Sequence, residues 1–96
     1  MPEQDDAAPD AVNSPLVFPT DFPIKVMGRA TEDFAQQVVS VVRAHSPDFD
    51  PATLEIRTSK EGNWLSLTAT IRATSRAQLD ALYRDLTAHP EVKVVL

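Results

Sequence analysis

Residues 64–73 alternate between apolar and polar side chains along their whole length. Successive side chains of a strand point to opposite faces, so this segment is predicted to be a long strand with one buried face. The apolar side consists of Leu65, Leu67, Ala69, Ile71 and Ala73. The other side is open to water or to a partner, and we take it as the candidate interaction face: Trp64, Ser66, Thr68, Thr70 and Arg72.

Three shorter segments show the same period of two. The first is Phe22–Gly28, in which Phe22, Ile24 and Val26 alternate with Lys25 and Met27. The second is Leu54–Thr58, with Glu55 and Arg57 directed outward, and the last is Val92–Leu96. Residues 59–63 separate the second strand from residues 64–73, and their glycine, Gly62, supplies the positive φ that a hairpin loop needs.

Two segments have a helical period instead. Apolar residues recur at helical spacing over 31–45, with Thr31 as the expected N-cap and Ser46-Pro47 as the stop. A second stripe, formed by Leu79, Leu82, Tyr83 and Leu86, follows Ser75-Arg76-Ala77-Gln78, which fits a capping box. Pro90 lies just beyond its end.

The resulting order, β-α-β-β-α-β, predicts an α+β ferredoxin-like fold. Right-handed crossovers place both helices on one face of a four-stranded antiparallel sheet with strand order 4-1-3-2. The side chains expected to face the helices are Ile24, Val26, Ile56, Leu65, Leu67, Ile71, Val92 and Val94. The uncovered face is expected to add Lys25, Met27, Lys93 and Val95 to the polar side of residues 64–73.

Composition separates a tail from a body. Residues 1–16 hold four carboxylates, three prolines and no basic residue, which predicts a disordered acidic tail before a single domain at residues 17–96. The net charge of −5 is therefore mostly the tail's, since ten acidic residues remain against nine basic ones. Because the body is nearly neutral, it lacks the excess of basic residues that attracts nucleic acid or anionic membranes. We therefore expect neither as a partner.

The chain has no cysteine, which excludes disulfides and thiolate chemistry. No signal peptide and no apolar run long enough to span a bilayer are evident, so the expected location is cytoplasmic.

Catalytic patterns are also missing. His45 and His89 lie near predicted helix ends, where an imidazole interacts well with the helix dipole, and neither has a second ligand at metal spacing. No nucleophile elbow and no glycine-rich phosphate loop occurs. We therefore expect a protein that is not an enzyme, with no catalytic residue, no metal and no cofactor.

Two residues allow alternative interpretations. Gly28 provides either a positive φ or a close approach between helix and strand, or else it leaves free N–H groups at a helix start for an anion such as a carboxylate. Trp64 is either a stacking platform for RNA bases or a residue that covers the hairpin or an interface. The scarcity of other aromatic residues on the same face favours the second interpretation of Trp64.

A resemblance to a known family rests on several segments taken together. They are Phe18-Pro19 with Phe22, Lys25-Val26-Met27-Gly28, Ser59-Lys60 with Gly62-Asn63-Trp64, Leu82-Tyr83, and Val92-Lys93-Val94-Val95-Leu96. Over residues 18–96 the chain resembles the YbeD-like family of small bacterial proteins, with Glu61 as an additional residue in the hairpin motif. Members resemble ACT regulatory domains in fold and have no established activity.

Similarity to ACT domains implies a small-molecule site near the first turn, which on this chain singles out Met27, Gly28 and Arg29. We therefore expect a regulatory domain that senses a small-molecule effector or modulates a partner enzyme. The alternative is an interaction module, monomer or homodimer, that assembles through the open sheet face or through the edge strands Leu54–Thr58 and Val92–Leu96. RNA binding is the weakest hypothesis, because only the shared topology prompts it.

Overall fold

A computed structural model describes residues 16–96. The predicted tail, residues 1–16, lies outside the described residues except for Leu16, which packs against the core. The elements follow one another as β1 (Thr20–Arg29), α1 (Phe34–His45), a short 3-10 turn (Pro51–Thr53), β2 (Glu55–Thr58), β3 (Trp64–Ala73), α2 (Arg76–Ala88) and β4 (Val92–Val95). None of the helices in this part of the chain is long and apolar enough to cross a membrane.

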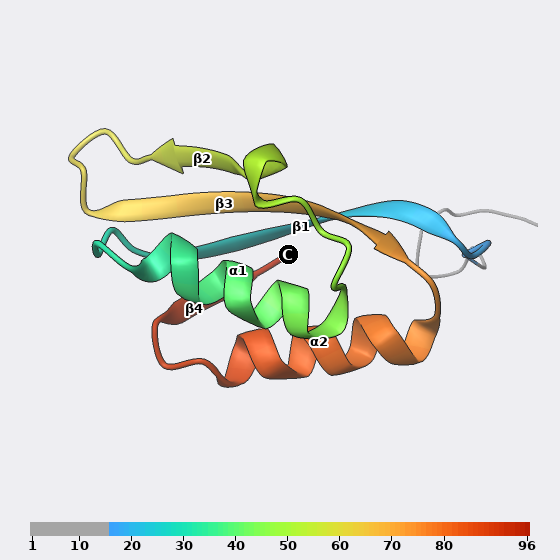
Figure 1. Ribbon diagram of the computed structural model, residues 1–96. Coiled ribbons are helices and arrows are strands. Elements are labelled where there is room, and N and C mark those ends of the chain that lie inside the picture. The colour runs from blue at the N-terminus through green and yellow to red at the C-terminus, as the bar shows by residue number, and fades with distance from the viewer. Residues whose placement is uncertain (1–15) are drawn as a thin grey trace, which may run out of the picture.

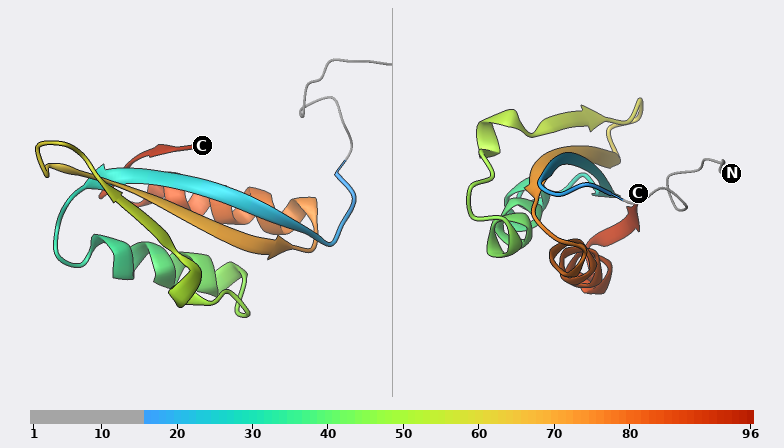
Figure 2. Two further views of the ribbon diagram at one scale, coloured as in Figure 1. Left: turned by 90° about the horizontal axis from the view of Figure 1, so that it is seen from above. Right: turned by 90° about the vertical axis from the view of Figure 1, so that its right-hand side faces the viewer.

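The sheet has the predicted topology. Its strand order is β2-β3-β1-β4, all neighbours run antiparallel, and β1 pairs with β3 along their full lengths from Thr20↔Ala73 to Arg29↔Trp64. Both helices lie on the same side of the sheet, and β2 lies farthest from them (Figure 1). The ferredoxin-like prediction is therefore confirmed, and the opposite side of the sheet stays uncovered (Figure 2).

The core lies between the helices and the inward side of β1 and β3. Ile24 and Val26 of β1 are fully buried there. On β3 the predicted alternation is confirmed, with Leu67, Ala69, Ile71 and Ala73 buried and Leu65 partly buried against them. The helices contribute Phe34, Val38, Val42, Leu79, Leu82 and Leu86. Burying apolar surface between two layers is the main favourable term in the stability of such a small domain.

The start of α1 differs from the prediction. Thr31 does not cap the helix, which begins at Phe34 with Asp33 in the N-cap position. The Thr31 hydroxyl lies 3.5 Å from the Asp33 carboxylate, and the Thr31 carbonyl accepts a bond from the N–H of Phe34, 3.3 Å away. Residues 31–33 therefore form a turn, and this turn places the Phe34 ring against the sheet.

Gly28 is the reason that Phe34 can reach the sheet. A Cβ added to Gly28 would lie 2.5 Å from the tip of the Phe34 ring and 2.4 Å from the carbonyl oxygen of Glu91. Gly28 is a buried β1 residue and its φ is not positive, so of the two structural interpretations the close approach is the correct one. Gly62, by contrast, has a φ of +81°, as the hairpin prediction required.

The two helices are joined by polar contacts at one end. Ser75 caps α2 as predicted, because its Oγ accepts from the N–H of Gln78 at 3.0 Å. The Gln78 side chain accepts from the N–H of Thr74 and donates to the carbonyl of His45, the last residue of α1. His45 also lies 2.6 Å from the Asp85 carboxylate. This contact gives His45 a role in helix packing.

The expected sides of Val94 and Val95 on the edge strand β4 are wrong. A bulge between Met27 and Gly28 shifts the β4 register, so that Val94 pairs with Met27 on the open face while Val92 and Val95 pack against the core. Val94 is accordingly 42% exposed, and Val95 does not belong to the open face. Ile56 pairs with the buried Leu67, yet it is 54% exposed because the helices do not extend over β2.

The contact at Gly28 predicts a large effect of a small substitution. We expect Gly28→Ala to lower the free energy of unfolding by about 3 kcal/mol, because neither the Glu91 backbone nor the buried Phe34 ring can move away without strain. Urea denaturation followed by Trp64 fluorescence measures this. The control is Gly62→Ala, where nothing lies within 4 Å of the added Cβ and only the positive φ costs about 1 kcal/mol. Equal losses in the two variants would contradict the packing account.

The burial of Tyr83 leads to a prediction that the free energy of unfolding changes with pH in the alkaline range. Burial raises the pKa of Tyr83 above its ordinary value, because the phenolate loses hydration. A pKa that is higher in the folded state contributes stability below pH 10, and that contribution is lost as the pH rises through the folded pKa. Tyr83 is the sole tyrosine, so absorbance at alkaline pH follows it alone. We expect Tyr83→Phe to remove this part of the pH dependence, and titration at the pKa of free tyrosine would contradict the expectation.

Candidate functional site

The candidate site is the open face of the sheet, whose side chains are ordered in rows by the strand register. Moving from the start of β1 toward the hairpin, Arg72 lies opposite Asp21, and Thr70 lies opposite Pro23. The next row is Glu55, Thr68, Lys25 and Leu96, the last of which exchanges two backbone hydrogen bonds with Lys25. The remaining rows are Arg57, Ser66, Met27 and Val94, and finally Trp64 and Arg29.

This face is positively charged although the chain is acidic. By strand register it carries Lys25, Arg29, Arg57 and Arg72 against the carboxylates of Asp21 and Glu55. Lys93, which is expected on this face, lies at the bulge and has no register partner in β1, so it is not counted here. The remaining described residues carry eight carboxylates against five cations. The nearly neutral total of the body therefore hides a separation of charge between the two sides of the sheet.

A small apolar hollow lies at the hairpin end of the open face. It has a volume of about 230 Å³ and is lined by Met27, Arg57, Thr58, Ser59, Trp64, Leu65 and Ser66. The Arg29 guanidinium lies 5.4 Å from the centroid of the Trp64 ring, a cation–π arrangement that helps to orient both side chains. The hairpin that carries Trp64 is itself ordered by Ser59, whose Oγ accepts from the N–H groups of Asn63 and Trp64.

A second, more polar hollow adjoins the first. Its volume is about 600 Å³, and its lining consists of Lys25, Glu55, Ile56, Arg57, Ser66 and Thr68. Arg57 and Ser66 line both hollows, so the two are neighbours over β2, β3 and β1. We call this pair of hollows the β2–β3 groove.

Exposed apolar side chains extend the site toward the other edge of the sheet. Trp64 is 43% exposed, and Val94 and Leu96 lie beyond β1, next to Met27 and Lys25. Strand alternation alone could not predict Val94 here, because the bulge reverses its side. The sequence alone also could not predict that Arg57 and Lys25 line the same groove, because their proximity depends on the pairing of three strands.

The predicted small-molecule triplet is not brought together. Met27 and Arg29 point to the open face, where Met27 lines the apolar hollow and Arg29 stacks on Trp64. Gly28 has no side chain, and the Phe34 ring and the Glu91 carbonyl occupy the space on the opposite side that a Cβ there would need. The N–H groups of Ala30 and Thr31, which follow, donate to the carbonyls of Asn63 and Arg29. Five residues separate Gly28 from the start of α1.

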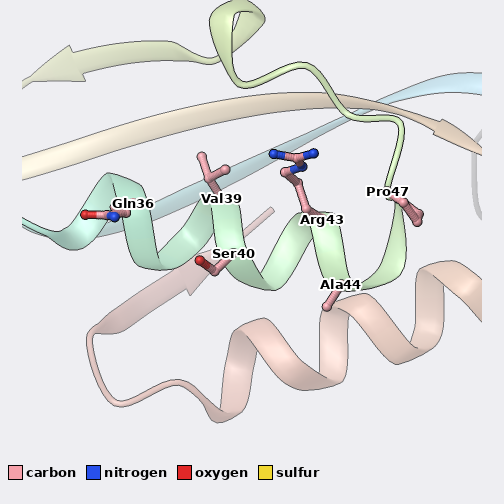
Figure 3. A pocket seen from close by; sticks show the side chains of 6 residues that line it. All are labelled: Gln36, Val39, Ser40, Arg43, Ala44 and Pro47. Carbon is pink, nitrogen blue, oxygen red and sulfur yellow. The ribbon is translucent and has the colours of Figure 1, made fainter.

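Other parts of the described chain offer less. The outer face of α1 has a hollow of about 480 Å³ lined by Gln36, Val39, Ser40, Arg43, Ala44 and Pro47 (Figure 3). Arg43 is the charged residue of that lining, and no aromatic ring accompanies it. Within residues 16–96, no three His, Asp or Glu side chains gather in a way that could hold a metal ion. His89 accepts from the N–H of Glu91, which orders the turn before β4.

The chemistry of the open face is that of binding. Its lysine and arginine side chains donate to carboxylates or phosphates, and its apolar hollow accepts a side chain of moderate size. The hydroxyls of Ser66 and Thr68 lie between these two features along β3. Such a surface fits a partner that combines negative charge with an apolar anchor.

Comparison with known proteins places this chain among small bacterial proteins. A family described as "Protein of unknown function (DUF493)" matches residues 13–96. A UPF0250 protein of Ralstonia nicotianae is 57% identical over 81 residues, which cover 84% of each chain. A UPF0250 protein of Nitrosomonas europaea is 53% identical over 81 residues, which cover 84% of this chain and 93% of the relative. These matches confirm the resemblance to the YbeD-like family.

Two solved structures share the fold. Protein HP0495 from H. pylori superposes with a TM-score of 0.71 at 16% identity, covering 94% of this chain and 96% of that one. The ACT domain from the GTP pyrophosphokinase of Chlorobium tepidum has a TM-score of 0.54 at 22% identity, covering 80% of this chain and 97% of that domain. At these identities the likeness concerns the fold alone, and it agrees with the ACT-like prediction.

The exposure of Trp64 predicts that it contributes little to stability. We expect Trp64→Ala to cost about 1 kcal/mol or less, because nearly half of the side chain is in water. Leu67→Ala, on the buried side of the same strand, is expected to cost about 3 kcal/mol. Thermal unfolding followed by far-ultraviolet circular dichroism compares the two. A larger loss for Trp64→Ala would show that this residue serves the hairpin rather than a binding surface.

Proposed function

This chain belongs to the DUF493 family, and we propose that it is a small binding module, without catalytic chemistry of its own, that works through the open face of its sheet. The observation that carries the proposal is the excess of cations on that face in a chain of net charge −5. Charge that gathers on one side of an acidic protein steers an oppositely charged partner to that side.

The partner that fits best is an acidic protein segment with an apolar side chain. Lys25 and Arg57 border the β2–β3 groove and can each hold a carboxylate, while Met27 and Trp64 line the apolar hollow beside them. Aromatic, methionine and arginine side chains are those enriched at protein interfaces. An apolar anchor in a hollow surrounded by charge is the usual arrangement of an interaction hot spot.

Self-association through the whole face is less favourable. Two copies packed face to face would bring an excess of like charge together, which opposes association. Nucleic acid also fits less well, because Trp64 is the sole tryptophan and no second aromatic side chain lies in the rows of this face.

Regulation of an enzyme is the role that we propose for such binding. The fold neighbour from GTP pyrophosphokinase is an ACT domain of an enzyme, and this likeness supports a regulatory role by analogy alone. By occupying an acidic segment of a partner, the module can change which conformation of that partner is populated. A small-molecule effector near Met27, Gly28 and Arg29 stays a prediction.

A titration with a model acidic peptide tests the proposal. We expect a synthetic peptide of Glu-Glu-Leu repeats to shift the backbone amide signals of Lys25, Arg57, Ser66 and Thr68, with an affinity that falls steeply as salt is added. The double variant Lys25→Glu/Arg57→Glu should bind about tenfold more weakly or worse, because two attractive contacts become repulsive.

The matched control is Arg43→Glu, which reverses a charge on the outer face of α1 (Figure 3) and should leave binding unchanged. Shifts spread over both sides of the molecule, or an equal loss in the Arg43 variant, would contradict the proposal. If a single-stranded RNA oligonucleotide binds more tightly than the peptide in the same experiment, the partner of this face is RNA and the proposal of a protein partner is wrong.

A further inference from the structure

We propose that residues 1–15 of this chain bind the open face of the same molecule and compete there with the acidic partner. This inference rests on the proposed function, because it concerns the regulation of the same surface. It assigns to the N-terminal segment the role of an internal competitor.

Charge complementarity is the first argument. The segment contains Glu3, Asp5, Asp6 and Asp10 and no basic residue. The surface with the opposite sign is the open face, where four of the five rows contain a cation: Arg72, Lys25, Arg57 and Arg29. The remainder of the described chain has an excess of carboxylates and would repel the segment. Electrostatics therefore favours one side of the sheet as its docking surface.

The point of attachment is the second argument. The described chain begins next to the start of β1, at the end of the sheet where the open face begins with Arg72 and Asp21 (Figure 1). From there the rows continue along β3, a strand of 10 residues, or about 33 Å. A segment of 15 residues spans up to about 50 Å when extended, so its carboxylates can reach Lys25 and Arg57.

The composition of the segment suits this role. The segment also contains Val12, an apolar side chain that could serve as the anchor. The four carboxylates all precede residue 13, where the match to the family begins.

Tethering makes a weak contact sufficient. A segment joined to the surface that it binds acts at an effective concentration in the millimolar range. Even if the free peptide bound with a dissociation constant of about 1 mM, the tethered segment would cover the face about half of the time. A partner would then bind about twofold more weakly than it would to an uncovered face, and about tenfold more weakly if that dissociation constant were about 0.1 mM.

A spin label locates the segment directly. The chain has no cysteine, so Ala7→Cys provides a single attachment point for a nitroxide in the full-length protein. We expect the label to broaden the amide signals of Lys25, Arg57, Ser66 and Thr68 and to spare Gln36 and Arg43 on the outer face of α1. High salt should remove the broadening.

The same label separates one molecule from two. Labelled protein without nitrogen-15 is mixed with unlabelled nitrogen-15 protein, so that broadening in this sample reports only contacts between copies. We expect no broadening there. Broadening of equal strength in the mixed sample, or broadening on both sides of the sheet, would overturn the inference.

Competition is measured with a charge-neutralised full-length variant, Glu3→Gln/Asp5→Asn/Asp6→Asn/Asp10→Asn. We expect this variant to bind the Glu-Glu-Leu peptide two- to tenfold more tightly than the unaltered chain. The control is a variant in which four carboxylates away from the open face are neutralised: Glu32→Gln, Glu61→Gln, Asp80→Asn and Glu91→Gln. We expect this variant to bind the peptide with the affinity of the unaltered chain.

The outcomes distinguish the two proposals. Peptide binding that is equal in the unaltered and the neutralised protein overturns the internal competitor while leaving the binding module intact. Equal tightening in the neutralised variant and in the control reduces the effect to net charge and also overturns the competitor. Absence of peptide binding in every variant overturns the proposed function together with it.

Discussion

The contact between Phe34 and Gly28 is the constraint on which the rest of this structure depends. The Phe34 ring lies where any side chain at Gly28 would have to be, and the carbonyl of Glu91 approaches the same position from the turn before β4. At Gly28, therefore, the start of α1, the end of the central strand β1 and the turn before β4 are in contact. Because a packed interior has no spare volume, this contact keeps α1 against the inward side of the sheet.

The position of the helices decides which surface is free to bind. With α1 and α2 both on the inward side, the opposite side of the sheet is left without cover (Figure 2). By strand register, the hydroxyls of β3 and the cations of β1 and β2 lie on that side. The Phe34 ring also occupies the space beside Gly28 on the inward side of the sheet. The small-molecule site implied near Met27, Gly28 and Arg29 stays a prediction, while the β2–β3 groove lies on the open face.

Charge separation across the sheet gives that groove its chemistry. The inward layer and its loops carry most of the carboxylates, and the open face carries four cations against two carboxylates. Salt in water screens the field of each charge beyond about one Debye length. A partner at the open face therefore responds to the local excess of positive charge more than to the net charge of the whole chain. This distribution connects the proposed acidic partner with the acidic N-terminal segment, which presents the same chemistry to the same surface.

The sequence by itself determined the element order, the antiparallel sheet, the full extent of β3 and the side of β3 that is exposed. These features depend on a period of two or on helical spacing, both of which are local. Pairing between strands decided the rest, including the bulge that turns Val94 outward and the meeting of Lys25 with Arg57 in one groove. Packing decided that α1 begins at Phe34 and that Ile56 stays exposed. A periodic pattern states which way a side chain points along its own strand, whereas only the tertiary structure decides what lies opposite it.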